Sequence, residues 1–354
     1  MTVGSRLLVL FATAVAVVAV VACHSPAAHA ERPELGMSVS LVGADDAEIQ
    51  RQFDLLSTMN VKMVRFDFDW SRIEGVKGTF DWSFTDRMVR AASTHSMKVL
   101  ALLTYSPSWA RPSGTGSHVP PTDVADYATF ARVAAQRYSP LGVDRWEIWN
   151  EPNIGDFWQP KPNIDQYGAL FRAAAAALRD VDPRATVLTG GLTRGTTTKD
   201  RSRIAQTEFI DGLYANGSAQ LASAIAIHPY SFPVLPAVGG PEAAGRFADL
   251  PAVHAVMDHW GDGGKKIWAT EFGAPTGTDD EAMSEADQAK SIAQAEQMVR
   301  AWNWMGPLII FELRDHGTDR SDIEQNFGVL NNDLTPKEAG RALLDGQGGA
   351  ADDH

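Results

Sequence analysis

The 354-residue chain has a single cysteine, Cys23, and no excess of positive charge, with 31 Lys and Arg against 44 Asp and Glu. One cysteine cannot build a disulfide framework, and a net charge of −13 argues against a nucleic-acid partner or an anionic membrane bound through a basic face. The sequence also lacks a Gly-rich phosphate loop and a Gly-x-Ser-x-Gly elbow, so nucleotide binding and serine hydrolase chemistry have no support. The 44% of hydrophobic residues and ten Trp instead indicate a globular protein with a large core.

The first thirty residues have the pattern of an export signal. Arg6 precedes an uncharged apolar run at 7–23, followed by small and polar residues. This pattern is typical of a secretory signal. A transmembrane anchor is the alternative interpretation, although the run is at the short end of the length that a membrane span needs. Two processing sites compete: cleavage after A-H-A at 28–30, or a lipobox-like V-V-A-C that would lipidate Cys23 and anchor the protein to the membrane. We therefore expect a secreted protein or a surface lipoprotein.

From residue 35 onward, short apolar runs alternate with longer helical segments, and Gly, Pro, Ser and Asp are common between them. The predicted strands are 37–41, 63–68, 99–104, 146–149, 186–188, 224–227, 267–270 and 308–311. The predicted helices are 47–59, 84–93, 124–136, 164–178, 208–214, 243–259, 285–302 and 336–344. Eight such pairs favour a single (β/α)8 barrel of the α/β class over a doubly wound open sheet, because no phosphate loop follows the first strand. The expected domains are a signal peptide at 1–30, a catalytic barrel at 31–345 and a flexible tail at 346–354.

Polar residues end several predicted strands, where a barrel of this kind places its active site. The positions concerned are Arg65, Asp67, Asp69, Asn150, Glu151, His228, Tyr230, Glu271, Glu312, Arg314 and Asp315. Glu151 and Glu271 end the fourth and seventh strands and should face each other across the mouth. Paired carboxylates suit glycosidic cleavage, in which one protonates the leaving oxygen while the other attacks the anomeric carbon or activates water. The sequence does not determine the gap between them, so retention and inversion of configuration both stay open on this ground.

The sequence WEIWNEPN at 146–153 resembles the strand-four signature of the retaining glycoside hydrolases of clan A, closest to family 39 and neighbouring family 5 enzymes. Similar motifs follow in the same order along the chain: WSRIE at 70–74, GTFDW at 78–82, SPSWA at 106–110, VDP at 181–183, GG at 190–191, HPY at 228–230, TEFG at 270–273 and FELRD at 311–315. The resemblance therefore extends over nearly all of the chain after the export signal.

The resemblance implies a role for each matching residue. Glu151 would be the general acid/base and Glu271 the nucleophile of a covalent glycosyl-enzyme. Asn150 would hold a sugar hydroxyl. The same pocket would also be lined by Arg65, His228 and Tyr230. Arg65 and Tyr230 would keep Glu271 ionised and correctly turned. No metal and no cofactor is expected, the partner is a carbohydrate, and we expect a monomer.

Aromatic side chains commonly stack on sugar faces, and several follow predicted strand ends. The candidates for the cleft are Trp70, Tyr105, Trp109, Trp158 and Phe311, whereas Trp146, Trp268 and Trp302 are predicted to lie in the core. Phe311 stands where related enzymes commonly have Trp. The export signal suggests a cell-envelope or biofilm glycan as substrate. Two alternatives to hydrolysis are a catalytically silent carbohydrate-binding barrel and a transglycosylase that uses the same site.

Overall fold

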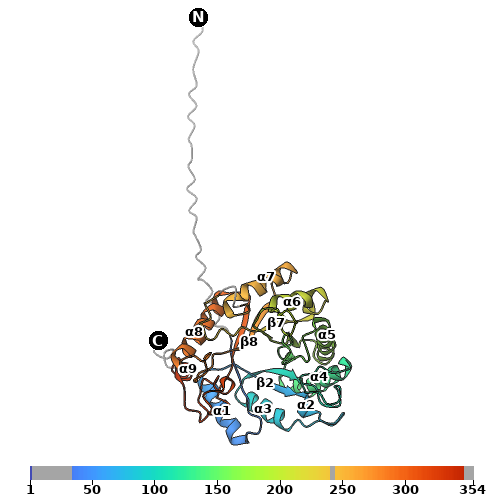
Figure 1. Ribbon diagram of the computed structural model, residues 1–354, viewed down its shortest axis with the longest axis horizontal. Helices are drawn as coiled ribbons and strands as arrows, with labels where there is room; N and C mark the ends of the chain where they lie inside the picture. Colours follow the sequence, from blue (N-terminus) through green and yellow to red (C-terminus); the bar gives the residue numbers. More distant parts are fainter. Residues whose placement is uncertain (2–33, 240–243, 347–354) are drawn as a thin grey trace. The chain divides into compact units, whose positions relative to one another are not determined.

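A computed structural model describes Met1 and residues 34–239 and 244–346 of the chain. The expected signal peptide, Cys23 and nearly all of the expected tail lie outside these residues. Nine parallel strands occupy the eight positions of a closed barrel, with helices around it (Figure 1). The strands are β1 (Leu35–Ser38), β2 (Met63–Asp69), β3 (Lys98–Thr104), β4 (Arg145–Ile148), β5 (Thr186–Thr189), β6 (Leu192–Thr193), β7 (Ala224–His228), β8 (Lys266–Phe272) and β9 (Met305–Ile310). The predicted (β/α)8 barrel is confirmed.

The fifth position of the barrel is divided between β5 and β6 by Gly190 and Gly191. β5 pairs with β4 on one side, and both segments pair with β7 on the other, which closes the barrel. Sequence analysis predicted one strand at this position because the glycine pair ends the apolar run.

The helices are α1 (Asp46–Thr58), α2 (Trp70–Ile73), α3 (Ser83–Thr94), α4 (Val124–Tyr138), α5 (Ile164–Val181), α6 (Gln206–Ala215), α7 (Leu250–His259), α8 (Glu285–Ala301) and α9 (Glu338–Asp345). Side-chain caps start several of them: Asp45, Asn163 and Ser284 accept hydrogen bonds from the first turns of α1, α5 and α8. The predicted helix 243–259 begins only at Leu250, after a short 3-10 turn at Phe247–Asp249. Among the described residues, no helix has both the length and the apolar character that crossing a membrane needs.

The inside of the barrel changes from apolar to polar along the strands. Its apolar cluster is Met63, Leu100, Leu188, Ala224, Ala226, Trp268 and Ile309. Side chains two residues apart point to the same face of a strand. The next inward positions toward the carboxyl ends are therefore Arg65 after Met63, His228 after Ala226 and Thr270 after Trp268. This alternation places a polar layer directly above the apolar plug, at the end of the barrel where the predicted site residues lie.

Candidate active site

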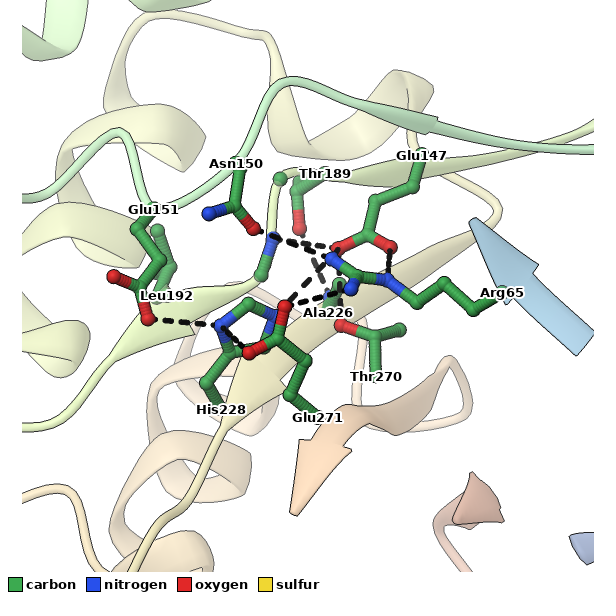
Figure 2. Close-up of polar contacts among 12 residues, drawn as sticks. Arg65, Glu147, Asn150, Glu151, Thr189, Leu192, Ala226, His228, Thr270 and Glu271 are labelled. Atoms are coloured by element: carbon green, nitrogen blue, oxygen red, sulfur yellow. Dashed lines mark hydrogen bonds and ion pairs between the residues drawn. The ribbon is translucent and has the colours of Figure 1, made fainter. Parts of the chain in front are cut away.

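Arg65 is the centre of the polar layer, and its guanidinium contacts three acceptors (Figure 2). Its Nη1 lies 2.6 Å from Glu271 Oε1, its Nε 2.7 Å from Glu147 Oε2, and its Nη2 3.2 Å from Asn150 Oδ1. Burial alone would lower the pKa of Arg65, but the negative charges of Glu147 and Glu271 outweigh burial and raise it. Arg65 therefore stays cationic and holds two carboxylates and an amide from the ends of β4 and β8 in fixed positions.

Glu147 is a site residue that sequence analysis did not single out. Its side chain is completely buried, and Oε1 also accepts hydrogen bonds from Gly191 N and Thr270 Oγ1, each at 2.9 Å. A buried carboxylate needs such partners, because an unpaired buried charge is costly. The signal in the sequence is its position: a Glu inside a hydrophobic strand, inward by alternation, on the same barrel face as an Arg from β2.

Glu271 is held from two sides. Besides Arg65, Tyr230 donates its hydroxyl to Glu271 Oε2 at 2.7 Å. Burial would raise the pKa of Glu271, but His228, Arg65 and Tyr230 together lower it below its usual value. The residue is only 8% exposed and lines the pocket, and its lowered pKa keeps the carboxylate ionised.

Glu151 meets His228 at the other end of the same layer. His228 Nδ1 lies 2.9 Å from Glu151 Oε1 and 3.5 Å from Glu271 Oε2, so the buried imidazole connects the two carboxylates (Figure 2). Burial would lower the pKa of His228, yet the charges of Glu271 and Glu151 raise it. Glu151 and Trp149 adopt positive φ angles of 43° and 68°. Such left-handed backbone in residues with side chains is unfavourable and is typically retained where it orients a functional group.

The glycine pair between β5 and β6 makes room for this arrangement. A Cβ at Gly191 would lie 2.0 Å from His228 Nε2, and one at Gly190 would lie 2.5 Å from the carbonyl oxygen of Trp149. The backbone of Gly191 also accepts a hydrogen bond from Glu151 N at 3.1 Å while donating to Glu147. These glycines are required because backbone and imidazole approach each other more closely than any side chain would allow.

A pocket of about 440 Å³ opens above these groups. Its lining includes the predicted residues Arg65, Asp67, Tyr105, Asn150, Glu151, Tyr230, Glu271, Phe311 and Glu312, together with Thr193, Arg194, Phe232, His316 and Glu324. His228 lies behind Glu151 and is completely buried. The volume and the mixture of aromatic and polar walls are typical of a small-molecule or sugar site.

Further acids surround the mouth. Burial of Asp67 by the pocket walls raises its pKa to about 7, although its side chain remains open to water in the pocket. Glu312 is 2% exposed, its Oε2 lies 2.9 Å from His316 Nε2, and burial raises its pKa. Asp315, which sequence analysis placed at the mouth, is instead buried against Lys337 Nζ at 2.7 Å. It stabilises the loop after β9 and has no contact with the pocket.

None of the three Trp side chains that were expected to form the sugar-binding surface lines the pocket. Trp70 and Trp158 are completely buried and pack edge-on against Trp109 and Trp149, respectively. Trp109 is partly buried, donates to the carbonyl oxygen of Glu74 at 2.7 Å and does not line the pocket. The segments after the strand ends fold back onto the helices, so their large rings fill the core rather than the cleft.

One group of potential metal ligands exists among the described residues: atoms of Glu151, His228 and Glu271 lie within 4.8 Å of one another. The chemistry of the set does not favour a divalent cation. Arg65 already places a permanent positive charge 2.6 Å from Glu271, and His228 Nδ1 is engaged by Glu151. The three side chains fit a proton-transfer site better than a metal site.

No protein-family model matches this sequence, and no curated protein matches it significantly. Solved structures do share its architecture. A family 39 glycoside hydrolase from the gut symbiont Bacteroides cellulosilyticus WH2 superimposes with a TM-score of 0.73 at 24% identity, over 89% of this chain and 63% of that one. A monomeric β-xylosidase from Caulobacter crescentus CB15 gives 0.68 at 18% identity, over 89% and 68%.

A family 5 enzyme from Streptomyces cattleya, solved with GlcNAc, gives a TM-score of 0.66 at 15% identity, over 88% of this chain and 79% of that one. The chain thus spans about 63% of the length of the family 39 enzyme. At these identities the likeness concerns the fold. The chain thus shares its (β/α)8 fold with these glycoside hydrolases, one of which is a family 39 enzyme.

Proposed function

We propose that this protein is a retaining glycoside hydrolase whose acid/base is Glu151 and whose nucleophile is Glu271. The observation that carries the proposal is the distance between them: a carboxylate oxygen of each lies within 4.8 Å of the other. Retaining enzymes hold their two carboxyl groups about 5–5.5 Å apart, whereas inverting enzymes leave about 6.5–9.5 Å for a water molecule. The observed gap supports direct attack by a carboxylate on the sugar.

In the first step, Glu271 would attack the anomeric carbon while Glu151 gives its proton to the departing glycosidic oxygen, which leaves as an alcohol. A glycosyl ester on Glu271 results. In the second step, Glu151 would take a proton from water, whose oxygen displaces Glu271 and releases the sugar with its original configuration. The low pKa of Glu271 suits the nucleophile, because it is ionised before substrate binds.

The surrounding groups support the same division of roles. Asn150 is fixed by Arg65 beside the acid, where its amide nitrogen can donate to a sugar hydroxyl next to the reacting carbon. Tyr230 and Arg65 both bind the carboxylate of Glu271. These contacts would weaken gradually as the negative charge of Glu271 is lost to the new bond. His228 contacts both carboxylates, so its hydrogen bond to Glu151 would change each time Glu151 loses or gains a proton.

The test measures product release from a panel of envelope and plant polysaccharides and from aryl glycosides by wild type, Glu151→Ala and Glu271→Ala. Turnover of natural glycans should fall about 10²-fold to 10⁴-fold in both variants. Azide should restore activity with opposite anomeric products: Glu271→Ala should give an inverted glycosyl azide and Glu151→Ala a retained one. The exposed Glu338→Gln serves as control and should be unaffected.

Proton NMR identifies the anomer of the product that forms first, which decides between retention and inversion of configuration. A product of inverted configuration from wild type would overturn the retaining mechanism. Glycan binding without products from any form would identify a binding protein instead, and products undiminished in both Glu variants would place the active site elsewhere.

We also propose that the protein is exported and acts as a monomer on a glycan outside the cytoplasm. Support comes from the apolar run at 7–23 and the residues that follow it. Fractionation of cells that express the full chain and Cys23→Ser tests the site of processing. A membrane-bound wild type and a released variant would favour the lipid anchor, whereas release of both would favour cleavage after Ala30.

A further inference from the structure

Three arginines lie on segments that meet beside the pocket, on the side of Glu151. Arg194 follows β6 and lines the pocket. Arg203 is joined to the loop after Glu151, because its backbone forms a bridge with Ile154. Arg246 belongs to a segment that reaches the same place, since Gly195 N donates to the carbonyl oxygen of Ala244 at 2.8 Å.

Close packing of the backbone brings the three segments together. A Cβ at Gly195 would lie 2.4 Å from Arg203 Cδ and 3.1 Å from its Nε, so the side chain of Arg203 lies against the residue that follows Arg194. A Cβ at Gly245 would lie 3.0 Å from Arg194 Cα. Burial lowers the pKa of Arg194, the charge of Glu281 acts in the opposite direction, and the charges of Arg246 and Arg203 add smaller decreases.

These arginines have few partners of their own. Within the described ranges 34–239 and 244–346, no carboxylate forms an ion pair with any of the three. The Nε atoms of Arg203 and Arg246 are buried without a hydrogen-bond partner. Arg194 donates one Nη1 bond to the carbonyl oxygen of Phe232 at 2.7 Å and lies 4.6 Å from the centre of that ring. Unpaired cations of this kind are unusual in a chain with a net charge of −13.

Two further acids of the pocket, Asp67 and Glu312, lie across the barrel from this cluster. Asp67 is on β2 and Glu312 follows β9, and these strands flank β1. In a barrel of eight positions, the strand opposite β1 is the β5 and β6 pair, which leads to Arg194. The pocket therefore has a negative side and a positive side, which would orient a substrate that carries charge at one end.

Resting on the proposed function, we propose that the substrate is an acidic glycan and that Arg194, Arg203 and Arg246 bind its anionic group, a carboxylate or a sulfate or phosphate ester. Guanidinium groups bind such oxyanions in pairs of parallel hydrogen bonds, and free N–H groups are what this cluster offers. The cluster lies next to Glu151, which protonates the leaving oxygen, so the acidic sugar would occupy the leaving-group side of the pocket.

The first experiment uses inorganic sulfate as the probe, since sulfate needs no recognition of a sugar. Thermal unfolding of the full chain is followed with sulfate and with chloride at equal ionic strength. Sulfate should raise the unfolding temperature of wild type and of the exposed control Arg184→Gln, but not of the triple variant Arg194→Gln, Arg203→Gln, Arg246→Gln. An equal response of wild type and triple variant overturns the anion site.

The second experiment names the substrate class. Binding of a polyglucuronate oligosaccharide and of its carboxyl-reduced counterpart, which share one backbone, is measured by calorimetry in the Glu151→Gln background. The acidic form should bind about tenfold or more tightly, and the triple variant should lose this preference. Equal affinities, or no binding of the acidic form, would overturn an acidic substrate. An anion preference without hydrolysis of any glycan would contradict the proposed function and leave the anion site in place, so the two failures are distinguishable.

Discussion

Glu147 Oε2 lies 2.7 Å from the Nε of Arg65, and both side chains are buried beneath the carboxylates of Glu151 and Glu271. This pair determines where Arg65 can present its remaining N–H groups, and these in turn hold Glu271 and Asn150. The support for the proposed nucleophile therefore lies one layer below the pocket.

Glu147→Gln tests this relationship. The amide can still accept hydrogen bonds from Gly191 and Thr270, but the negative charge opposite Arg65 is lost. Removing one partner of a buried ion pair costs about 3–5 kcal/mol, so we expect the free energy of unfolding in urea to fall by roughly 3 kcal/mol. Turnover should fall as well. Unchanged stability relative to Glu338→Gln would show that Arg65 does not depend on this partner.

Gly191→Ala tests the close approach of backbone and imidazole. The added Cβ would lie 2.0 Å from His228 Nε2 and 2.7 Å from Thr270 Oγ1, so the imidazole must shift and its contact with Glu151 is disturbed. We expect a loss of roughly 1–3 kcal/mol in stability, as for overpacked cores, and a larger relative loss of turnover. Gly264→Ala, which meets nothing within 4 Å, is the matched control. If Gly191→Ala kept wild-type turnover, the claim that activity requires a glycine beside His228 would be refuted.

Asp67 provides a pH test. Its pKa is raised to about 7 in the folded protein, whereas the ordinary value is 3.8. Between these values the unfolded chain has lost a proton that the folded protein keeps, so the stability contribution of Asp67 falls as pH rises from about 4 to about 7 and then levels off. Asp67→Asn should therefore gain stability relative to wild type across this window. Water in the pocket reduces the size of the effect, and parallel stability curves would contradict it.

Trp158 and Phe311 should respond differently to removal of their rings. Trp158 is completely buried, so Trp158→Ala should lower the free energy of unfolding by about 3–5 kcal/mol. Phe311 lines the pocket and is partly exposed, so Phe311→Ala should mainly raise KM. Urea unfolding and steady-state kinetics of both variants separate the effects. The assignment fails if Trp158→Ala keeps its stability and loses only affinity.

The architecture could be predicted because hydrophobic periodicity is a local property. All eight barrel positions and the order of strands and helices follow from runs such as 99–104 and from capping residues such as Ser284. The same alternation, together with the rule that barrel sites lie at the carboxyl ends of strands, brings Arg65, Glu151, His228 and Glu271 together, as their contacts confirm.

Other features depended on tertiary structure. Trp70 and Trp158 follow strand ends, yet the direction in which their segments fold buries both rings. The partner of Glu147 is Arg65 on β2, 82 residues away in the sequence, and no local pattern around Glu147 identifies it. The unpaired arginines at the rim come from segments up to 52 residues apart and meet only through backbone contacts.

The sequence by itself determined the barrel, its polar end and the pair of carboxylates, because strand alternation and strand order are encoded along the chain. Only the tertiary structure decided the gap between Glu151 and Glu271, the burial of Glu147 and the separation of charge across the pocket. The physical reason is that the alternation of apolar and polar residues along a strand specifies which face each side chain occupies. Distance, exposure and partner depend on how distant segments pack against one another.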